Sequence, residues 1–218
     1  MSVPPSAGSP SKQFGDVTAP VSAAGWTAGW TLAEKSEDLA RRYRCAADDA
    51  AKLSRGLAAG DLHGRMRAVV DAVWTHLHQL GVSWVGFYMP QPVAVGNFGG
   101  AEPITELVLG PSRNTPACSP IGMHGVCGQS FRGTCVRIVD DVRDLGPDYI
   151  ACDPRDRSEI VLPIVAPGTA VGTGAGGPCI AVLDVDSHAT GRFGPVDADG
   201  LRGVIRAAGL SSPANTPG

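Results

Sequence analysis

The chain has 218 residues and a formal net charge of −3, with 43% apolar and 18% charged residues. This composition predicts one domain with a substantial core, and the nearly balanced charge argues against electrostatic binding to nucleic acid. No apolar run approaches the roughly 20 residues that cross a bilayer, so we expect no membrane span. The N-terminus lacks the charged and apolar regions of a secretory signal, so we expect a cytoplasmic protein, with an organellar address as the alternative.

Helices are predicted first along the chain. Residues 1–30 are rich in Ser, Pro, Gly and Ala without periodicity, which is typical of a disordered tail. Residues 33–58 are Ala-rich and carry apolar side chains near helical spacing. A second helix is predicted from Leu62 to Leu80, where apolar residues repeat every 3.6 positions and Gly81 stops the pattern.

A series of strands is predicted next, because short runs of β-branched, aromatic and aliphatic residues follow. These runs cover residues 83–89, 106–110, 135–139, 159–165 and 179–185, with irregular loops over 111–134 and 141–157. A last helix is predicted over 197–208. Strands that follow one another without intervening helices favour an antiparallel sheet with helices packed on one face, an α+β domain.

Two carboxylates alternate with apolar residues in the last predicted strand. Asp184 and Asp186 are two residues apart and so share one face of a strand, while Leu183 and Val185 point to the other face. Carboxylates side by side repel one another, so they need a ligand, a metal ion, a proton or solvent. A solvent-facing polar edge is an alternative of equal weight.

Two aromatic residues share one face of the first predicted strand. Trp84 and Tyr88 flank Gly86 on that face, with Val85 and Phe87 on the other. The two rings with a glycine between them are compatible with the wall of an apolar pocket. Ordinary core packing is the preferred interpretation of the pair alone.

The six cysteines divide by their local sequence. Cys118, Cys127 and Cys152 lie in irregular segments rich in glycine and proline, where functional residues concentrate. The others lie on a predicted helix or at the start of a predicted strand (Cys45, Cys135 and Cys179). Without a secretory signal we expect reduced thiols, and a buried, idle thiol is the alternative for each. No C-x-x-C pair is present, so we predict no metal site, and neither a Walker loop nor a Rossmann fingerprint occurs.

Short segments that occur together and in order closely resemble free methionine-(R)-sulfoxide reductase, a family of GAF-domain enzymes. They are WVGFY (84–88), LVLGP (107–111), PAC (116–118), GVCG (125–128), IACD (150–153), SEIVLPI (158–164) and VLDVDS (182–187). The resemblance covers about residues 60–208 and implies a GAF fold, a central antiparallel sheet of about six strands with helices packed on it. It divides the chain into a disordered tail (1–30), an N-terminal helix (31–60), the GAF catalytic domain (61–210) and a C-terminal tail (211–218).

The resemblance implies an oxidoreductase of the oxidative-stress response that reduces the R epimer of free methionine sulfoxide, not the protein-bound residue. Cys152 is similar to the family's catalytic cysteine, Cys118 to the resolving cysteine and Cys127 to a third redox-active one. A thiolate at Cys152 would become a sulfenic acid and then a disulfide with Cys118. Thioredoxin would reduce that disulfide by exchange, without a bound cofactor.

The resemblance also implies a substrate pocket built from aromatic and acidic side chains. Glu159 and Asp186 are our candidates for the hydrogen bond that makes the sulfoxide sulfur electrophilic, because a buried carboxylic acid beside a carboxylate stays protonated. Asp184 would hold the substrate ammonium group. Trp84 and Tyr88 would enclose the methyl-bearing sulfur.

Two other functions stay open beside the enzyme. A GAF module can bind a small ligand and regulate another protein, and a thiol protein can signal through its disulfide without turnover. Three loop cysteines exceed what simple ligand sensing needs. The resemblance further implies a homodimer, with free methionine-R-sulfoxide and thioredoxin as the other partners.

Overall fold

The computed structural model of the chain describes residues 29–93, 104–149, 152–166 and 178–213. The predicted disordered tail over 1–30 and the predicted C-terminal tail over 211–218 therefore lie largely outside the described residues. Among the helices of the described ranges, none combines the length and the apolar character that crossing a membrane requires.

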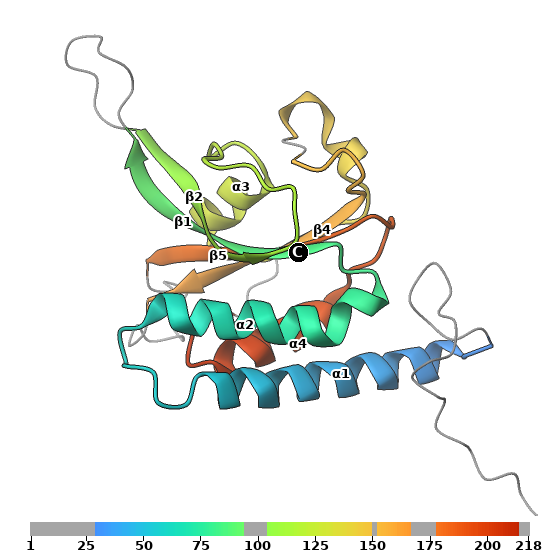
Figure 1. The fold of residues 1–218 in the computed structure, drawn as a ribbon. Helices are drawn as coiled ribbons and strands as arrows, with labels where there is room; N and C mark the ends of the chain where they lie inside the picture. Colours follow the sequence, from blue (N-terminus) through green and yellow to red (C-terminus); the bar gives the residue numbers. More distant parts are fainter. Residues whose placement is uncertain (1–28, 94–103, 150–151, 167–177, 214–218) are drawn as a thin grey trace, which may run out of the picture.

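One antiparallel sheet with helices on both of its faces makes up the described part of the chain (Figure 1). In chain order the elements are α1 (Leu32–Leu53), α2 (Leu62–Leu77), the short 3-10 helix η1 (His78–Leu80), β1 (Trp84–Val93), β2 (Ile104–Arg113), α3 (Val126–Gly133), β3 (Arg137–Val139), η2 (Val142–Asp148), β4 (Ser158–Val165), β5 (Cys179–Ser187) and α4 (Pro195–Ala207). The five described strands run in the order β2-β1-β5-β4-β3. This confirms the predicted α+β class and antiparallel sheet.

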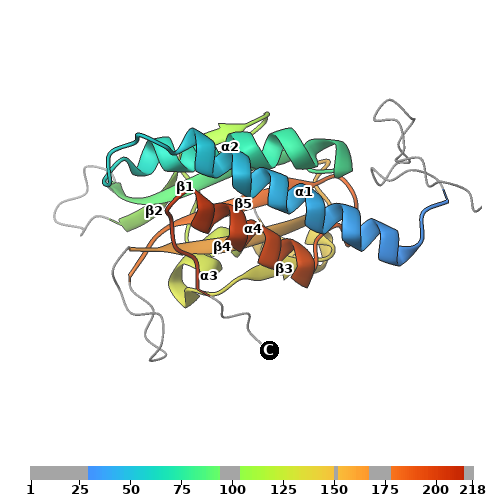
Figure 2. The same ribbon diagram turned by 90° about the horizontal axis from the view of Figure 1, so that it is seen from below.

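Helices α2 and α4 cover one face of the sheet, and α1 packs on their outer side. Helix α3 lies against the other face together with the loops around it (Figures 1 and 2). The prediction that the helices pack on one face is therefore wrong for α3, which falls in a segment expected to be an irregular loop. Gly128 and Gly133 hide this eight-residue helix in the sequence, because glycine opposes a helix unless tertiary packing compensates. Burial of Val126 and Ser130 supplies that packing.

The boundaries of the predicted elements shift by a few residues. The first helix ends at Leu53 instead of residue 58, and Thr31 and Glu34 begin it with a reciprocal capping box. Gly81 ends the second helical segment with a positive φ of 93°, as its stop signal predicts.

The structure confirms that successive side chains of β1 and β5 point to opposite faces of the sheet, as predicted. Leu183 and Val185 belong to the large core between the sheet and the three helices α1, α2 and α4. Trp84 and Tyr88 belong to a second, smaller core on the opposite face, beneath α3. The sheet thus has an apolar core on each of its faces.

Candidate active site

The pairing of three neighbouring strands builds a polar row on the α3 side of the sheet. Trp84 of β1 is opposite Asp186 of β5, and Asp186 is opposite Glu159 of β4. Asp184 lies two residues along β5, opposite Gly86. Carboxylate oxygens of Glu159, Asp184 and Asp186 lie within 4.8 Å of one another. The shared face predicted for the two aspartates is confirmed, and a third carboxyl group joins them.

A pocket lies over this row. Its free volume is about 40 Å³, which is room for roughly three water molecules. Its walls come from β1, β4, β5, α3 and the segments around the two loop cysteines, with these lining residues: Trp84, Tyr88, Pro116, Ala117, Ile121, Gly122, Gly125, Val126, Cys127, Tyr149, Cys152, Asp156, Glu159, Asp184 and Asp186. Every predicted site residue except Cys118 is on this list.

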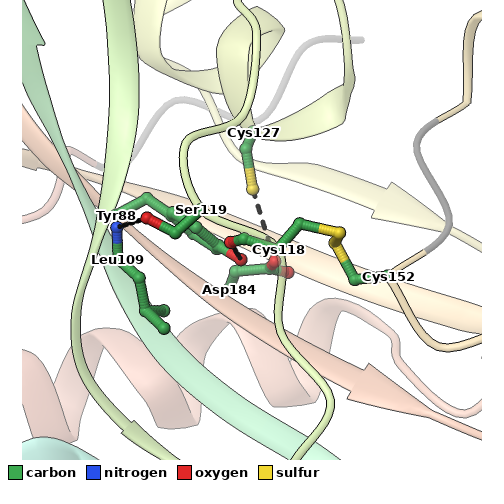
Figure 3. Close-up of a disulfide and its surroundings, with 7 residues drawn as sticks. All are labelled: Tyr88, Leu109, Cys118, Ser119, Cys127, Cys152 and Asp184. Carbon is green, nitrogen blue, oxygen red and sulfur yellow. Dashed lines mark hydrogen bonds between the residues drawn. A yellow bond between two sulfur atoms is a disulfide. The ribbon is translucent and has the colours of Figure 1, made fainter.

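A disulfide between Cys118 and Cys152 closes one side of the pocket (Figure 3). Their Cα atoms are 5.3 Å apart, and the bond joins the loop before α3 to the segment before β4. The Tyr88 hydroxyl donates a hydrogen bond of 2.9 Å to the carbonyl oxygen of Cys118. The disulfide thus joins the two cysteines to which the resemblance gives the catalytic and resolving roles.

Cys127 is a free and buried thiol at the start of α3. Its Sγ lies 3.3 Å from Oδ2 of Asp184 and donates a hydrogen bond to it (Figure 3). Burial, and then the charges of Asp184 and Glu159, raise the pKa of Cys127 well above its ordinary value. In the disulfide form Cys127 is therefore a neutral hydrogen-bond donor.

Gly86 makes room for the aromatic wall of the pocket. A Cβ atom at this position would lie 2.6 Å from Cζ2 of Trp84, closer than real Cβ contacts come. The ring centroids of Trp84 and Tyr88 are 5.9 Å apart with the planes inclined by 32°. The two rings are core residues, as preferred from the sequence, and they also form the pocket wall.

Burial raises the pKa values of the three carboxyl groups in the cluster. It raises the pKa of Asp184 to about 7. Burial and then the charge of Asp184 raise the pKa of Glu159 and of Asp186 well above their ordinary values. Enclosed carboxyl groups so close together cannot all ionise, so at neutral pH at least one is a carboxylic acid that can donate a hydrogen bond.

Three polar atoms at the pocket are buried without a hydrogen-bond partner among the residues that the structure describes. They are Nε1 of Trp84, Oε1 of Glu159 and Oδ1 of Asp184. An unpaired buried polar atom costs about 1–3 kcal/mol, so such atoms are typical of a site that a ligand completes. One is an N–H donor and two are carboxyl oxygens, a set that suits a ligand carrying both an acceptor and a cationic donor.

The proton-holding carboxyls predict an unusual dependence of stability on pH. In the unfolded state the Asp184 carboxyl loses its proton near its ordinary pKa of about 4. In the folded state the same carboxyl keeps its proton up to about pH 7. The free energy of unfolding of the disulfide form therefore falls as pH rises between these values. In Asp184→Asn we expect a shallower fall, by about 1 kcal/mol per pH unit, measured by urea unfolding at pH 5, 6 and 7. The exposed Asp48→Asn is the control, and an unchanged slope in Asp184→Asn would contradict the assignment.

Among the lining residues that the sequence did not predict, two carry a titratable side chain. Tyr149 is half-buried there, and burial followed by the charge of Glu159 raises the pKa of its hydroxyl. Asp156 is buried and brings a fourth carboxyl group to the cavity. Both lie in a segment expected to be an irregular loop, which has no alternation to reveal the direction of a side chain. The position of Asp156 three residues before Glu159 is the only signal in the sequence.

Two carboxyl-rich groups in the described residues have the spacing of a metal site. One is the cluster of Glu159, Asp184 and Asp186, and the other joins Asp153 and Asp156 to His188. In each, three ligand atoms lie within 4.8 Å of one another. The absence of a metal ion from the reaction stays a prediction.

Comparison with known proteins gives relatives by sequence, although no family model matches the chain. Protein YtsP of Bacillus subtilis is 39% identical over 118 residues, which are 53% of this chain and 60% of YtsP. The free methionine-R-sulfoxide reductase of Escherichia coli is 35% identical over 126 residues, 57% of this chain and 62% of that protein. GAF domain-containing protein A of Dictyostelium discoideum is 33% identical over 129 residues, 59% of this chain and 68% of that protein. The chain thus spans less than two thirds of the length of the first two relatives.

Solved structures with the same fold include two from related sequences. A protein of Burkholderia vietnamiensis described as a GAF sensor is 32% identical with a TM-score of 0.60, and the match covers 78% of this chain and 92% of that one. The free methionine-R-sulfoxide reductase of Neisseria meningitidis, solved in complex with its substrate, is 29% identical with a TM-score of 0.59 over 78% of this chain and 87% of that one. The fold is therefore the GAF fold, with five described strands where about six were expected.

Proposed function

We propose that this chain, which belongs to the GAF-domain family and within it resembles the free methionine-R-sulfoxide reductases, reduces free L-methionine (R)-sulfoxide to L-methionine. One observation carries the proposal. A cluster of proton-holding carboxyl groups faces a disulfide across a small pocket, and three buried polar atoms there lack a partner among the described residues.

The polar atoms of the pocket match the groups of a zwitterionic sulfoxide. Asp184 has an unpaired oxygen for the substrate ammonium group. The indole N–H of Trp84 is an unpaired donor, and a protonated Glu159 or Asp186 is a second, so both can bind the sulfoxide oxygen. The rings of Trp84 and Tyr88 enclose the apolar methyl-bearing sulfur.

In the reaction, Cys152 is the nucleophile. Its thiolate attacks the sulfoxide sulfur to form a transient S–S bond, and the oxygen takes up a proton. The oxygen then transfers to Sγ of Cys152, so the Sγ–O bond of a sulfenic acid forms while the S–O bond of the substrate and the transient S–S bond break. The substrate sulfur gains the electron pair and leaves as the sulfide, methionine. A carboxylic acid among Glu159 and Asp186 supplies the proton to the oxygen.

Recycling starts from the sulfenic acid. The Cys118 thiol condenses with it to form the disulfide and one water molecule, and the short Cα distance of 5.3 Å between the two cysteines supports this step. A thioredoxin then reduces the disulfide by thiol exchange, so no bound cofactor takes part.

The protein acts in the oxidative-stress response of the cytoplasm, and we propose a homodimer.

The decisive experiment is NADPH oxidation coupled through thioredoxin and its reductase, with the separated R and S epimers of free methionine sulfoxide. We expect turnover of the R epimer alone, with none for an R-sulfoxide inside a peptide. Turnover of neither free epimer contradicts the enzyme. Binding of a small ligand without turnover favours a regulatory GAF module, and disulfide formation by peroxide alone favours a redox sensor.

Cys127 offers a separate prediction, because its thiol donates a hydrogen bond to Asp184. Cys127→Ala removes this donor beside the group that binds the substrate ammonium, and we expect kcat/KM to fall about tenfold, the effect of one charge-assisted hydrogen bond. Cys127→Ser keeps a donor and should recover most of the loss.

Cys118→Ser is the matched comparison for this test. It should release about one equivalent of methionine per protein and then stall with thioredoxin, because the sulfenic acid lacks its resolving thiol. A stall of the same kind in Cys127→Ser would contradict a hydrogen-bonding role and would make Cys127 part of the recycling path.

A further inference from the structure

Asp156 connects the pocket to a group outside it. Its carboxyl group lines the cavity with those of Glu159, Asp184 and Asp186, and its Oδ1 accepts a hydrogen bond of 3.2 Å from the Ser83 hydroxyl. Burial raises the pKa of Asp156, so this carboxyl exchanges a proton more readily at neutral pH than an exposed one. When ionised, it also raises the pKa of each of the other three carboxyls.

His188 lies between Asp156 and solvent. It follows β5 directly, 41% of its side chain is exposed, and its Nε2 lies 3.6 Å from Oδ1 of Asp156. The same nitrogen lies 3.4 Å from Oδ2 of Asp153. The His188 imidazole is exposed to solvent on one side and faces a buried carboxyl group on the other, so it is placed to carry protons between solvent and that carboxyl.

The two carboxyls at His188 differ in their ability to exchange a proton. The Arg155 guanidinium binds Asp153 through two nitrogens at 2.7 and 3.0 Å and holds the pKa of that carboxyl well below its usual range. Asp153 is thus a permanent anion that orients the imidazole. Among the described residues no arginine forms an ion pair or hydrogen bond with Asp156, so it is the carboxyl that can pass a proton on.

Each turnover of the proposed reaction needs a proton inside the pocket. Attack by a thiolate converts thiolate, sulfoxide and one proton into sulfenic acid and sulfide. The pocket carboxyl that gives this proton must regain one from solvent before the next turnover. We propose that His188 and Asp156 carry this proton from solvent to the carboxyls that face the substrate. The inference rests on the proposed function and adds a proton path to it.

The charged groups around this path come from three segments. Asp153 and Arg155 lie on the segment of Asp156, and Glu159 is the second residue of β4. Asp184 and Asp186 of β5 complete the set across the cavity. His188 and Asp156 act through these carboxyls and do not touch the substrate sulfur, so their removal should slow proton supply and leave substrate affinity little changed.

The test is a multiple-turnover measurement on the full-length chain, with thioredoxin and its reductase in excess so that reduction of the disulfide does not limit the rate. The protein is mixed with free methionine (R)-sulfoxide between pH 5.5 and 8.5, and released methionine is counted over time. In His188→Gln we expect the rate above pH 7 to fall about tenfold, at the low end of general acid–base effects, with a smaller loss at low pH where protons are abundant. Imidazole added to the buffer should restore the rate. The exposed His63→Gln is the control and should match the unchanged protein.

Variants of Asp156 separate the path from the fold. Asp156→Asn should lose the same rate without rescue by imidazole, whereas Asp156→Glu keeps a carboxyl and should retain most of it. If the unchanged protein releases methionine and His188→Gln matches it at every pH, the proton path is overturned. A slow His188→Gln that imidazole does not restore overturns it as well. If the unchanged protein releases no methionine, the proposed function itself fails.

Discussion

Replacing Cys152 with serine should abolish turnover of free methionine (R)-sulfoxide. The serine hydroxyl keeps nearly the same shape, but it is not ionised at neutral pH and cannot accept the oxygen as a sulfenic acid. We expect kcat/KM to fall by at least about 10³-fold, the size of effect that loss of a nucleophile produces in other enzymes. Thioredoxin-coupled NADPH oxidation measures the steady state, and methionine release from the reduced protein measures the chemical step.

Cys179→Ser is the matched control for the nucleophile. Cys179 begins β5 away from the pocket lining, and burial raises its pKa to about 11, so it is a thiol at neutral pH. Turnover should persist in this variant. Trapping with dimedone should label Cys152 in the Cys118→Ser protein after one turnover. Methionine release that survives in Cys152→Ser would move the attack to Cys118 or Cys127 and contradict the assigned nucleophile.

The part of the site that the sequence predicts is the part that lies on strands. A period of two places Asp184 with Asp186, and Trp84 with Tyr88, on shared faces, and the cores on the two sides of the sheet confirm this. The direction of a side chain on a strand is a local property, so local sequence suffices for it. The resemblance adds Glu159, which no local pattern singles out.

The part that could not be predicted depends on pairing between distant segments. Trp84, Asp186 and Glu159 meet because β5 pairs with both β1 and β4, and the register that aligns them is set by the whole sheet. Helix α3 was missed because its stability comes from the sheet beneath it and not from its glycine-rich sequence. Asp156 lies in an irregular segment, where only tertiary structure decides which way it points.

The division of the cysteines also depends on tertiary structure. Glycine and proline around Cys118, Cys127 and Cys152 separate them from the other three in the sequence, and all three lie at or beside the pocket. Local composition alone does not distinguish the three, whereas the structure joins Cys118 to Cys152 and leaves Cys127 as a buried donor to Asp184. This difference is the physical basis for expecting the three serine variants to behave differently.

Replacing Glu159 with glutamine should cause the second large loss of activity. Glutamine keeps the shape and can donate a hydrogen bond to the sulfoxide oxygen, but it has no proton to transfer. We expect kcat to fall by about 10²-fold, the ordinary effect of removing a general acid, while KM changes less because the hydrogen bond survives. The assay is steady-state turnover of free methionine (R)-sulfoxide from pH 5.5 to 8.5, with the exposed Glu37→Gln as the control.

The pH profile of this variant gives the sharper test. In the unchanged protein the chemical step needs a protonated carboxyl, so its rate should fall as pH rises through the raised pKa values of the cluster, that of Asp184 being about 7. Removing Glu159 removes one charge that opposes ionisation of Asp186, so the pKa that governs the remaining activity should move down. A Glu159→Gln protein with lower kcat and an acid-shifted profile supports proton donation from the cluster. An unshifted profile with a raised KM would mean that Glu159 only binds the substrate, and proton donation would then belong to Asp186 alone.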